Sequence, residues 1–163
     1  MNTRTNRNAL VLILGAGLLS ACGSEVAKVN PGPQCDFRAV NAQGPYRGPA
    51  LVPLVPGSAE VMPLNSVNLM DKSITNKILV QQTTARREEG GEVSVQTRLI
   101  NCTDFPLQLE ARTHFLDQTG MDAESVTAWT RLYSEPHGLT SYATRSTAGS
   151  VVNSYLVEVR ESQ

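Results

Sequence analysis

The feature that most constrains the fold is a strict alternation of apolar and polar residues in the middle of the chain. In residues 92–100 every second residue, from Val93 to Leu99, is apolar or threonine: Val93, Val95, Thr97 and Leu99. The same period returns in residues 107–115, where Leu107, Leu109, Ala111, Thr113 and Phe115 alternate with Gln108, Glu110, Arg112 and His114. Because successive side chains of a strand point to opposite faces, each run predicts a β-strand with one face in a core and one in water.

Further strands are expected on both sides of these two. Residues 78–87 are separated from 92–100 by the sequence EEGG, which predicts a hairpin. Residues 126–133, 139–147 and 151–160 supply three more strands, with turns at EPHG and AGS. In EPHG we expect Pro136 to preset φ and Gly138 to adopt a positive φ. The charges of the sequence ARREE are expected to protect a sheet edge.

These patterns define the fold class. No apolar stripe recurs with the period of a helix, and turn signals come every eight to twelve residues or so, as in two-sheet domains. We therefore expect an all-β fold, an immunoglobulin-like antiparallel β-sandwich of about six or seven strands, formed by residues 66–163.

Residues 1–21 have the pattern of a secretory signal peptide. Arg4 and Arg7 precede an apolar or glycine run from Ala9 to Leu19. This run is shorter than the roughly 20 apolar residues that a membrane-spanning helix needs.

The sequence Leu19-Ser20-Ala21-Cys22 resembles the lipobox of bacterial lipoproteins. The resemblance implies that Cys22 begins the mature protein and carries acyl chains such as palmitate, which together anchor it firmly in a membrane. Gly23 stands where an inner-membrane retention signal has aspartate, which implies a periplasm-facing outer-membrane lipoprotein. The alternative is a secreted protein in which Cys22 is only the first mature thiol.

Residues 22–65 are interpreted as a Pro/Gly-rich tether. Seven of the nine prolines lie between Pro31 and Pro63, where neither a strand nor a helix period persists. The favoured role is a spacer, and the alternative is that ALVPLV serves as a docking peptide. Without residues 1–21 the chain is mildly acidic, so no nucleic-acid partner is expected.

A family resemblance emerges from the segment NCTDFPLQLEARTHFLDQTG. Its pattern is similar to that of the YcfL-like periplasmic lipoproteins, and the matching residues are Asn101, Pro106, Arg112, Phe115, Asp117 and Gly120. The resemblance covers about residues 69–161 and implies a small immunoglobulin-like β domain on an envelope lipoprotein, in a family without an assigned catalytic role. Read from the residues alone, the motif is structural: Asn101 caps a turn, Pro106 begins a strand, and Asp117 with Gly120 closes a tight loop. An ion pair between Arg112 and Asp117 is a further candidate contact.

Two cysteines remain after Cys22. Cys35 lies in the tether and Cys102 at a strand end. An oxidising periplasm permits a disulfide between them, which we favour. Two free thiols or an intermolecular bond are the alternatives.

One group of residues is a candidate for partner binding. Trp129, Arg131 and Tyr133, together with Thr127, fall on one side of an expected strand, and such residues are enriched at interaction hot spots. The alternative places Trp129 in the core, as the central tryptophan of immunoglobulin-like sandwiches.

No chemistry is indicated by the remaining motifs. The two histidines, His114 and His137, are expected to be solvated rather than to bind a metal. Hydrolase and phosphate-loop motifs are absent from the sequence, so we expect no catalytic residue, no cofactor and no metal.

The expected function is therefore non-enzymatic. The first hypothesis is an outer-membrane lipoprotein whose periplasmic sandwich docks an envelope protein, as an assembly or regulatory accessory. The second is a structural lipoprotein subunit of an envelope-spanning, secretion-type complex. A third hypothesis, an enzyme acting on envelope glycans, has no motif in its support.

Overall fold

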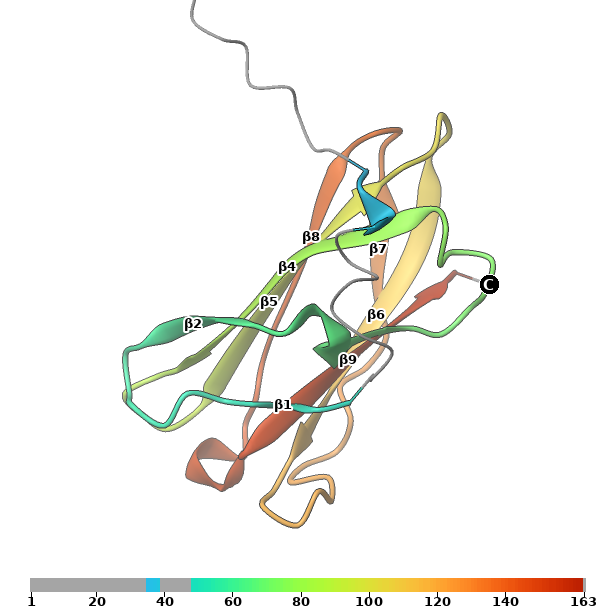
Figure 1. Ribbon diagram of the computed structural model, residues 1–163. Coiled ribbons are helices and arrows are strands. Elements are labelled where there is room, and N and C mark those ends of the chain that lie inside the picture. Colours follow the sequence, from blue (N-terminus) through green and yellow to red (C-terminus); the bar gives the residue numbers. More distant parts are fainter. Residues whose placement is uncertain (1–34, 39–47, 163) are drawn as a thin grey trace, which may run out of the picture. The chain divides into compact units, whose positions relative to one another are not determined.

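The computed structural model describes residues 35–38 and 48–162, all within the compact unit that spans residues 31–163. These residues form an all-β sandwich of two sheets (Figure 1). Its strands are β1 (Ala50–Leu51), β2 (Ala59–Met62), β3 (Val67–Leu69), β4 (Ile78–Arg87), β5 (Val93–Asn101), β6 (Leu107–Leu116), β7 (Thr130–Ser134), β8 (Leu139–Arg145) and β9 (Ser154–Glu161). Two short 3-10 helices, η1 (Leu64–Ser66) and η2 (Gly149–Val151), precede β3 and β9.

The strands are divided between sheet A, in the order β1-β9-β6-β7 with β3 also paired to β9, and sheet B, in the order β2-β4-β5-β8. The hairpin of β4 and β5 is confirmed in register, with Arg87 opposite Val93. All strand pairs are antiparallel except β3 and β9, which are parallel. The predicted sandwich is therefore confirmed, with one parallel pair added.

The core lies where the alternation predicts it. The inward residues of β5 and β6 are almost fully buried, and the largest buried side chains include Phe115, Tyr142 and Tyr155. Hydroxyl groups inside this core bond to one another, as Thr83 Oγ1 does to Thr97 Oγ1 at 3.1 Å and to Tyr155 Oη at 3.2 Å. Burial raises the pKa of the Tyr155 phenol, although hydrogen bonds with Ser66 and Thr83 oppose the rise.

The sandwich begins before the expected boundary at Ser66. The strands β1 and β2 pair with β9 and β4, and Ala50, Val52 and Met62 are buried in the core. Residues 48–65 therefore belong to the domain and not to a tether. The long strands β4 to β9 match the expected number, and β1 to β3 are short additions of two to four residues.

Two predicted strands start later than expected. β7 begins at Thr130 instead of residue 126, and β9 begins at Ser154 because η2 occupies Gly149–Val151. Thr127 bonds to the backbone of Thr113 and to Tyr142 Oη, so it faces inward and does not share a face with Trp129.

The turn EPHG differs in one detail. The positive φ of 52° is at His137, while Gly138 has no positive φ. A Cβ atom at Gly138 would lie 2.9 Å from the carbonyl oxygen of Glu135. The glycine is therefore required by space and not by its own backbone angle.

The charged run ARREE, at the end of β4, does not protect an edge. β4 lies between β2 and β5, so it is not an edge strand. Arg87, the last residue of β4, points inward and is only 8% exposed. Its guanidinium donates to the carbonyl oxygens of Pro53 (2.9 Å), Gly91 (2.9 Å) and Val152 (2.6 Å). A single buried cation thus joins three loops at one end of the sandwich.

Candidate functional site

Trp129 lies on the outer face of sheet A, directly before β7. The register of β6 and β7, continued by one residue, places it beside Arg112. The centre of its ring is 4.4 Å from the guanidinium carbon of Arg112 and 4.0 Å from that of Arg160. The side chain is half-buried and is not part of the core, which excludes the core position for Trp129. Two cation–π contacts, each contributing about 0.5–2 kcal/mol, hold the ring in place.

A carboxylate beside the tryptophan joins three strands. Glu110 on β6 accepts hydrogen bonds from Arg160 Nε on β9 at 2.9 Å and from Arg131 Nε on β7 at 3.4 Å. Glu110 is only 7% exposed, although its strand position faces outward. The hydrogen bond from Arg160 lowers the pKa of Glu110 and burial opposes this, while Arg131 and both positive charges lower it further.

A second carboxylate group lies on the other side of Arg112. Glu158 Oε2 accepts from Arg112 Nε at 2.7 Å and lies 3.2 Å from His114 Nε2, while His114 Nδ1 lies 3.2 Å from Asp122 Oδ1. Burial raises the pKa of Glu158, but the hydrogen bonds and charges of Arg112 and His114 outweigh it and lower the pKa below its ordinary value. Salt bridges and hydrogen bonds therefore fix the guanidinium groups that contact Trp129.

The neighbouring part of the surface is open to solvent. The Arg131 side chain is 78% exposed and Tyr133 is 56% exposed. Both line a hollow of about 150 Å³ that also includes Leu109 and Leu132. Trp129, Arg131 and Tyr133 thus form one patch, called the aromatic patch below, with an immobilised ring and two exposed side chains.

The residues of the family motif have structural positions. Asn101, fully buried, accepts from Thr103 N at 2.9 Å and donates to the carbonyl oxygens of Phe105 and Ser134. Pro106 directly precedes β6, and Phe115 is buried in the core. The turn, strand-start and core roles expected for these residues match the contacts in the structure.

Asp117 closes the loop after β6 but does not bind Arg112. Its Oδ1 accepts from Thr119 N, Thr119 Oγ1 and Met121 N, and Gly120 has a φ of 80°. The hydrogen bond from the Thr119 side chain lowers the pKa of Asp117, with burial opposing and backbone donors assisting. The suggested ion pair with Arg112 is therefore wrong, because Glu158 is directly opposite Arg112 in register and takes its place.

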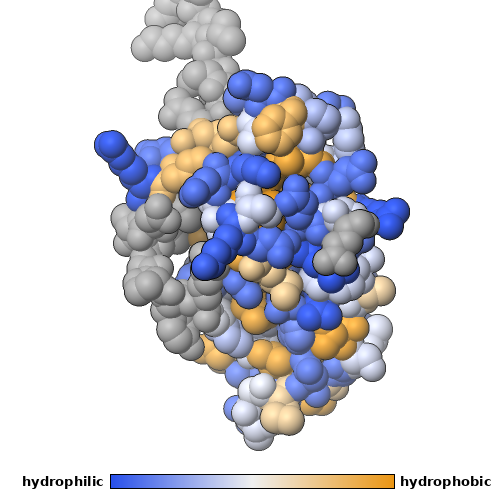
Figure 2. Space-filling model, turned by 90° about the vertical axis from the view of Figure 1, so that its right-hand side faces the viewer, coloured by the Kyte–Doolittle hydropathy of each residue, from blue (hydrophilic) through white to orange (hydrophobic). Residues whose placement is uncertain are grey.

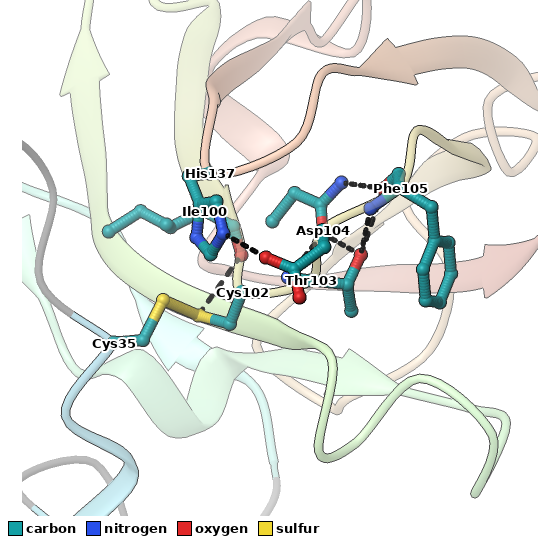
Figure 3. Close-up of a disulfide and its surroundings, with 8 residues drawn as sticks. Cys35, Ile100, Cys102, Thr103, Asp104, Phe105 and His137 are labelled. Atoms are coloured by element: carbon teal, nitrogen blue, oxygen red, sulfur yellow. Dashed lines mark hydrogen bonds and ion pairs between the residues drawn. A yellow bond between two sulfur atoms is a disulfide. The ribbon is translucent and has the colours of Figure 1, made fainter.

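Cys35 and Cys102 are joined in a disulfide with a Cα–Cα distance of 5.7 Å (Figure 3). The bond attaches the segment Cys35–Arg38 to the residue that follows β5. Figure 3 also shows His137 next to Asp104, with Nε2 2.8 Å from Oδ1. Both of these side chains are exposed, so His137 belongs to a solvated turn.

Other predictions fall outside what the structure describes. The signal peptide, Cys22 and Gly23 lie outside the described residues, as do the tether residues 22–34 and 39–47. Within residues 35–38 and 48–162, no helix is long and apolar enough to cross a membrane. The same residues contain no group of three or more metal-ligating side chains.

Sequence reasoning missed the partners of Trp129. Arg160, which contacts the ring, and Glu158, which holds Arg112, are on β9, about thirty residues further along the chain. The spacing of residues within the strand of Trp129 does not indicate either of them. A usable signal was present on β6, where Glu110, Arg112 and His114 form a charged outward row. Such a row on a β-strand invites opposite charges on its neighbour.

Fold and surface together define a small two-sheet β-sandwich protein with a charged outer face that carries aromatic side chains. No family model matches the chain, and no curated protein matches it. Among solved structures, cj0090 from Campylobacter jejuni is 17% identical, with a TM-score of 0.47 over 60% of this chain and 98% of that chain. A DUF1425 family member from Shewanella sp. pv-4 is 14% identical, with a TM-score of 0.47 over 71% of this chain and 98% of that chain. Both similarities are distant.

Proposed function

We propose that this protein is a non-enzymatic outer-membrane lipoprotein of the YcfL-like family, to which DUF1425 corresponds. Cys22 carries the lipid, the sandwich faces the periplasm, and the aromatic patch docks an envelope protein as an assembly or regulatory accessory. The lipobox and the motif from Asn101 to Gly120 support the family and the address.

The observation that carries the docking role is the arrangement around Trp129. Its ring is held by Arg112 and Arg160, whose carboxylate partners are in place, so little side-chain entropy remains to be lost on binding. Arg131 and Tyr133 beside it stay exposed. Tryptophan, tyrosine and arginine are the residue types that dominate binding energy at protein interfaces.

The character of the surface agrees with this mode of recognition. On the face seen in Figure 2, hydrophilic side chains predominate and hydrophobic surface is divided into separate patches. A non-obligate interface of this kind depends on a few anchor residues within a polar surround.

Photo-crosslinking in intact cells tests the proposal. A photoreactive amino acid at Tyr133 is expected to capture a defined envelope protein, and Arg131→Ala is expected to weaken that capture tenfold or more. The matched control places the same photoreactive group at Phe105, an aromatic residue of the β5–β6 turn that is 49% exposed. Equal capture at both positions, or none at Tyr133, would contradict docking at the aromatic patch.

Two further measurements separate the parts of the proposal. Mass spectrometry of the purified protein is expected to find acyl chains on Cys22, and an unmodified Cys22 would remove the anchor. Copurification in fixed stoichiometry with a large complex would instead favour the structural-subunit alternative.

A further inference from the structure

The outer face of sheet B carries rows of mostly polar side chains that run across β4, β5 and β8. They belong neither to the core nor to the aromatic patch. In one row the register places Arg86, Ser94 and Arg145 side by side, and in another it places Gln82, Arg98 and Ser141. A row of Thr84, Gln96 and Ala143 lies between them. Apart from the methyl group of Ala143, the outward side chains of these rows are amides, hydroxyls and guanidiniums across three strands.

These rows line two adjoining hollows. One has a volume of about 690 Å³ and the other about 310 Å³, and they share Thr84 and Gln96. The described residues that line them include three arginines but a single carboxylate, Glu88. The surface is therefore locally positive on a chain whose formal net charge is −1.

The charge of these arginines is only partly neutralised. Glu88 is shared by Arg86 Nε at 3.5 Å, Arg145 Nη2 at 3.7 Å and Ser94 Oγ at 2.7 Å. Arg98 is half-buried in the other row, and within the part of the chain that the structure describes no acid pairs with it. A half-buried guanidinium without a carboxylate partner can donate hydrogen bonds to the oxygens of an anionic ligand.

We infer that this face of sheet B binds an extended acidic peptide segment of a partner protein. On β5 the row of Arg98 and the row of Ser94 are four residues apart, which is about 13 Å along a strand. An extended peptide that lies parallel to the strands presents every second side chain to the sheet. Two acidic residues four positions apart in the peptide therefore reach both rows. The side-chain amides and hydroxyls between the rows can pair with its backbone.

The lining also argues against a nucleic acid as the ligand. No aromatic side chain lines either hollow among the described residues, so nucleic-acid bases have no platform on which to stack. Guanidinium groups form direct, charge-assisted hydrogen bonds with carboxylates, as the acids of such a peptide require. This inference does not depend on the lipid anchor or on docking at the aromatic patch.

Fluorescence anisotropy with the full mature chain in detergent tests it. The probe is a labelled serine-rich peptide with two glutamates four positions apart, measured at low ionic strength. Its affinity is expected to fall about tenfold in Arg98→Gln, since a hydrogen bond to a charged group contributes at least that factor. Added salt is expected to weaken binding as well.

Controls define the outcomes. Arg145→Gln removes an exposed guanidinium from the other row and should also weaken binding, whereas Arg131→Gln on sheet A should not. The same peptide with glutamines in place of glutamates should fail to bind, and one with glutamates three positions apart should bind more weakly. Equal binding of all these peptides, no effect of Arg98→Gln, or tighter binding of an anionic polysaccharide would overturn the inference.

Discussion

Arg87 illustrates how one side chain can organise one end of the sandwich. Its position continues the inward set of β4, after Thr83 and Ala85, so strand alternation carries a full positive charge toward the interior. The charge is tolerated because three carbonyl oxygens from separate loops accept its hydrogen bonds. The sequence alone indicates the inward position, but it does not indicate acceptors that lie as far away as Pro53 and Val152.

The first prediction concerns this buried cation. Arg87→Met should lower the free energy of unfolding by about 3 kcal/mol, because three buried carbonyl oxygens lose their donor. Urea denaturation measures the change. Arg86→Met is the matched control on the adjacent, exposed position, and it should cost no more than about 1 kcal/mol. Equal stability of the two variants would show that the three hydrogen bonds contribute nothing.

The second prediction concerns pH. The pKa of Glu158 is lowered in the folded protein from its ordinary 4.5, so between the folded pKa and 4.5 the unfolded chain binds a proton that the folded chain does not. Its contribution to stability is complete above about pH 4.5 and is lost as the pH falls through the lower folded pKa.

Urea denaturation at neutral and acidic pH checks this. Glu158→Gln should show a smaller loss of unfolding free energy on acidification than the native chain, while Glu89→Gln, at an exposed position, should keep the native slope. The pKa values of Glu110 and Asp117 are also lowered in the folded protein, so these two residues also make stability fall on acidification. Glu158→Gln should therefore reduce the loss of unfolding free energy without abolishing it. An identical slope in all three proteins would argue against the role of Glu158.

At the scale of elements, the long strands were predictable and the short ones were not. Strands such as β5 and β6 carry enough alternating positions for the period to be recognised. β1 and β2 contain two and four residues next to prolines, where the local composition indicates a linker. Their pairing is decided by the edges of other strands: β1 pairs with β9 near the end of the chain, and β2 pairs with β4 beyond η1 and β3. For the same reason the sequence indicated the aromatic patch but not the arginines that hold Trp129.

The third prediction follows from these short strands. In a Cys102→Ser background, a chain that begins at Gly48 should fold, whereas one that begins at Ser66 should be largely unfolded. The shorter chain lacks the core residues Ala50, Val52 and Met62 and leaves one edge of β4 unpaired. Thermal unfolding followed by circular dichroism distinguishes the two chains. A cooperative transition of similar midpoint in both would restore the boundary at Ser66.

At the scale of the whole molecule, the two sheets present two different outer faces. Sheet A carries paired charges around an immobilised tryptophan, and sheet B carries arginines with one shared carboxylate. The core between them does not require either arrangement, because it is filled by the inward set of side chains. Substitutions on one face should therefore leave binding at the other unchanged, since the sites share no side chain.

The disulfide sets the length of the chain segment that links Cys22 to the domain. Cys35 follows Cys22 by thirteen residues, whereas Gly48 follows it by twenty-six. A chain extends by at most about 3.6 Å per residue, so with Cys22 acylated as we propose, Cys35 lies within about 47 Å of Cys22. The closed bond, with its Cα–Cα distance of 5.7 Å, then keeps Cys102 within about 53 Å of Cys22. If the bond were reduced, the linking segment would lengthen from thirteen to twenty-six residues, which doubles its maximum extended length. A thiol reductant in the envelope would then set how far from the membrane the domain can reach a partner.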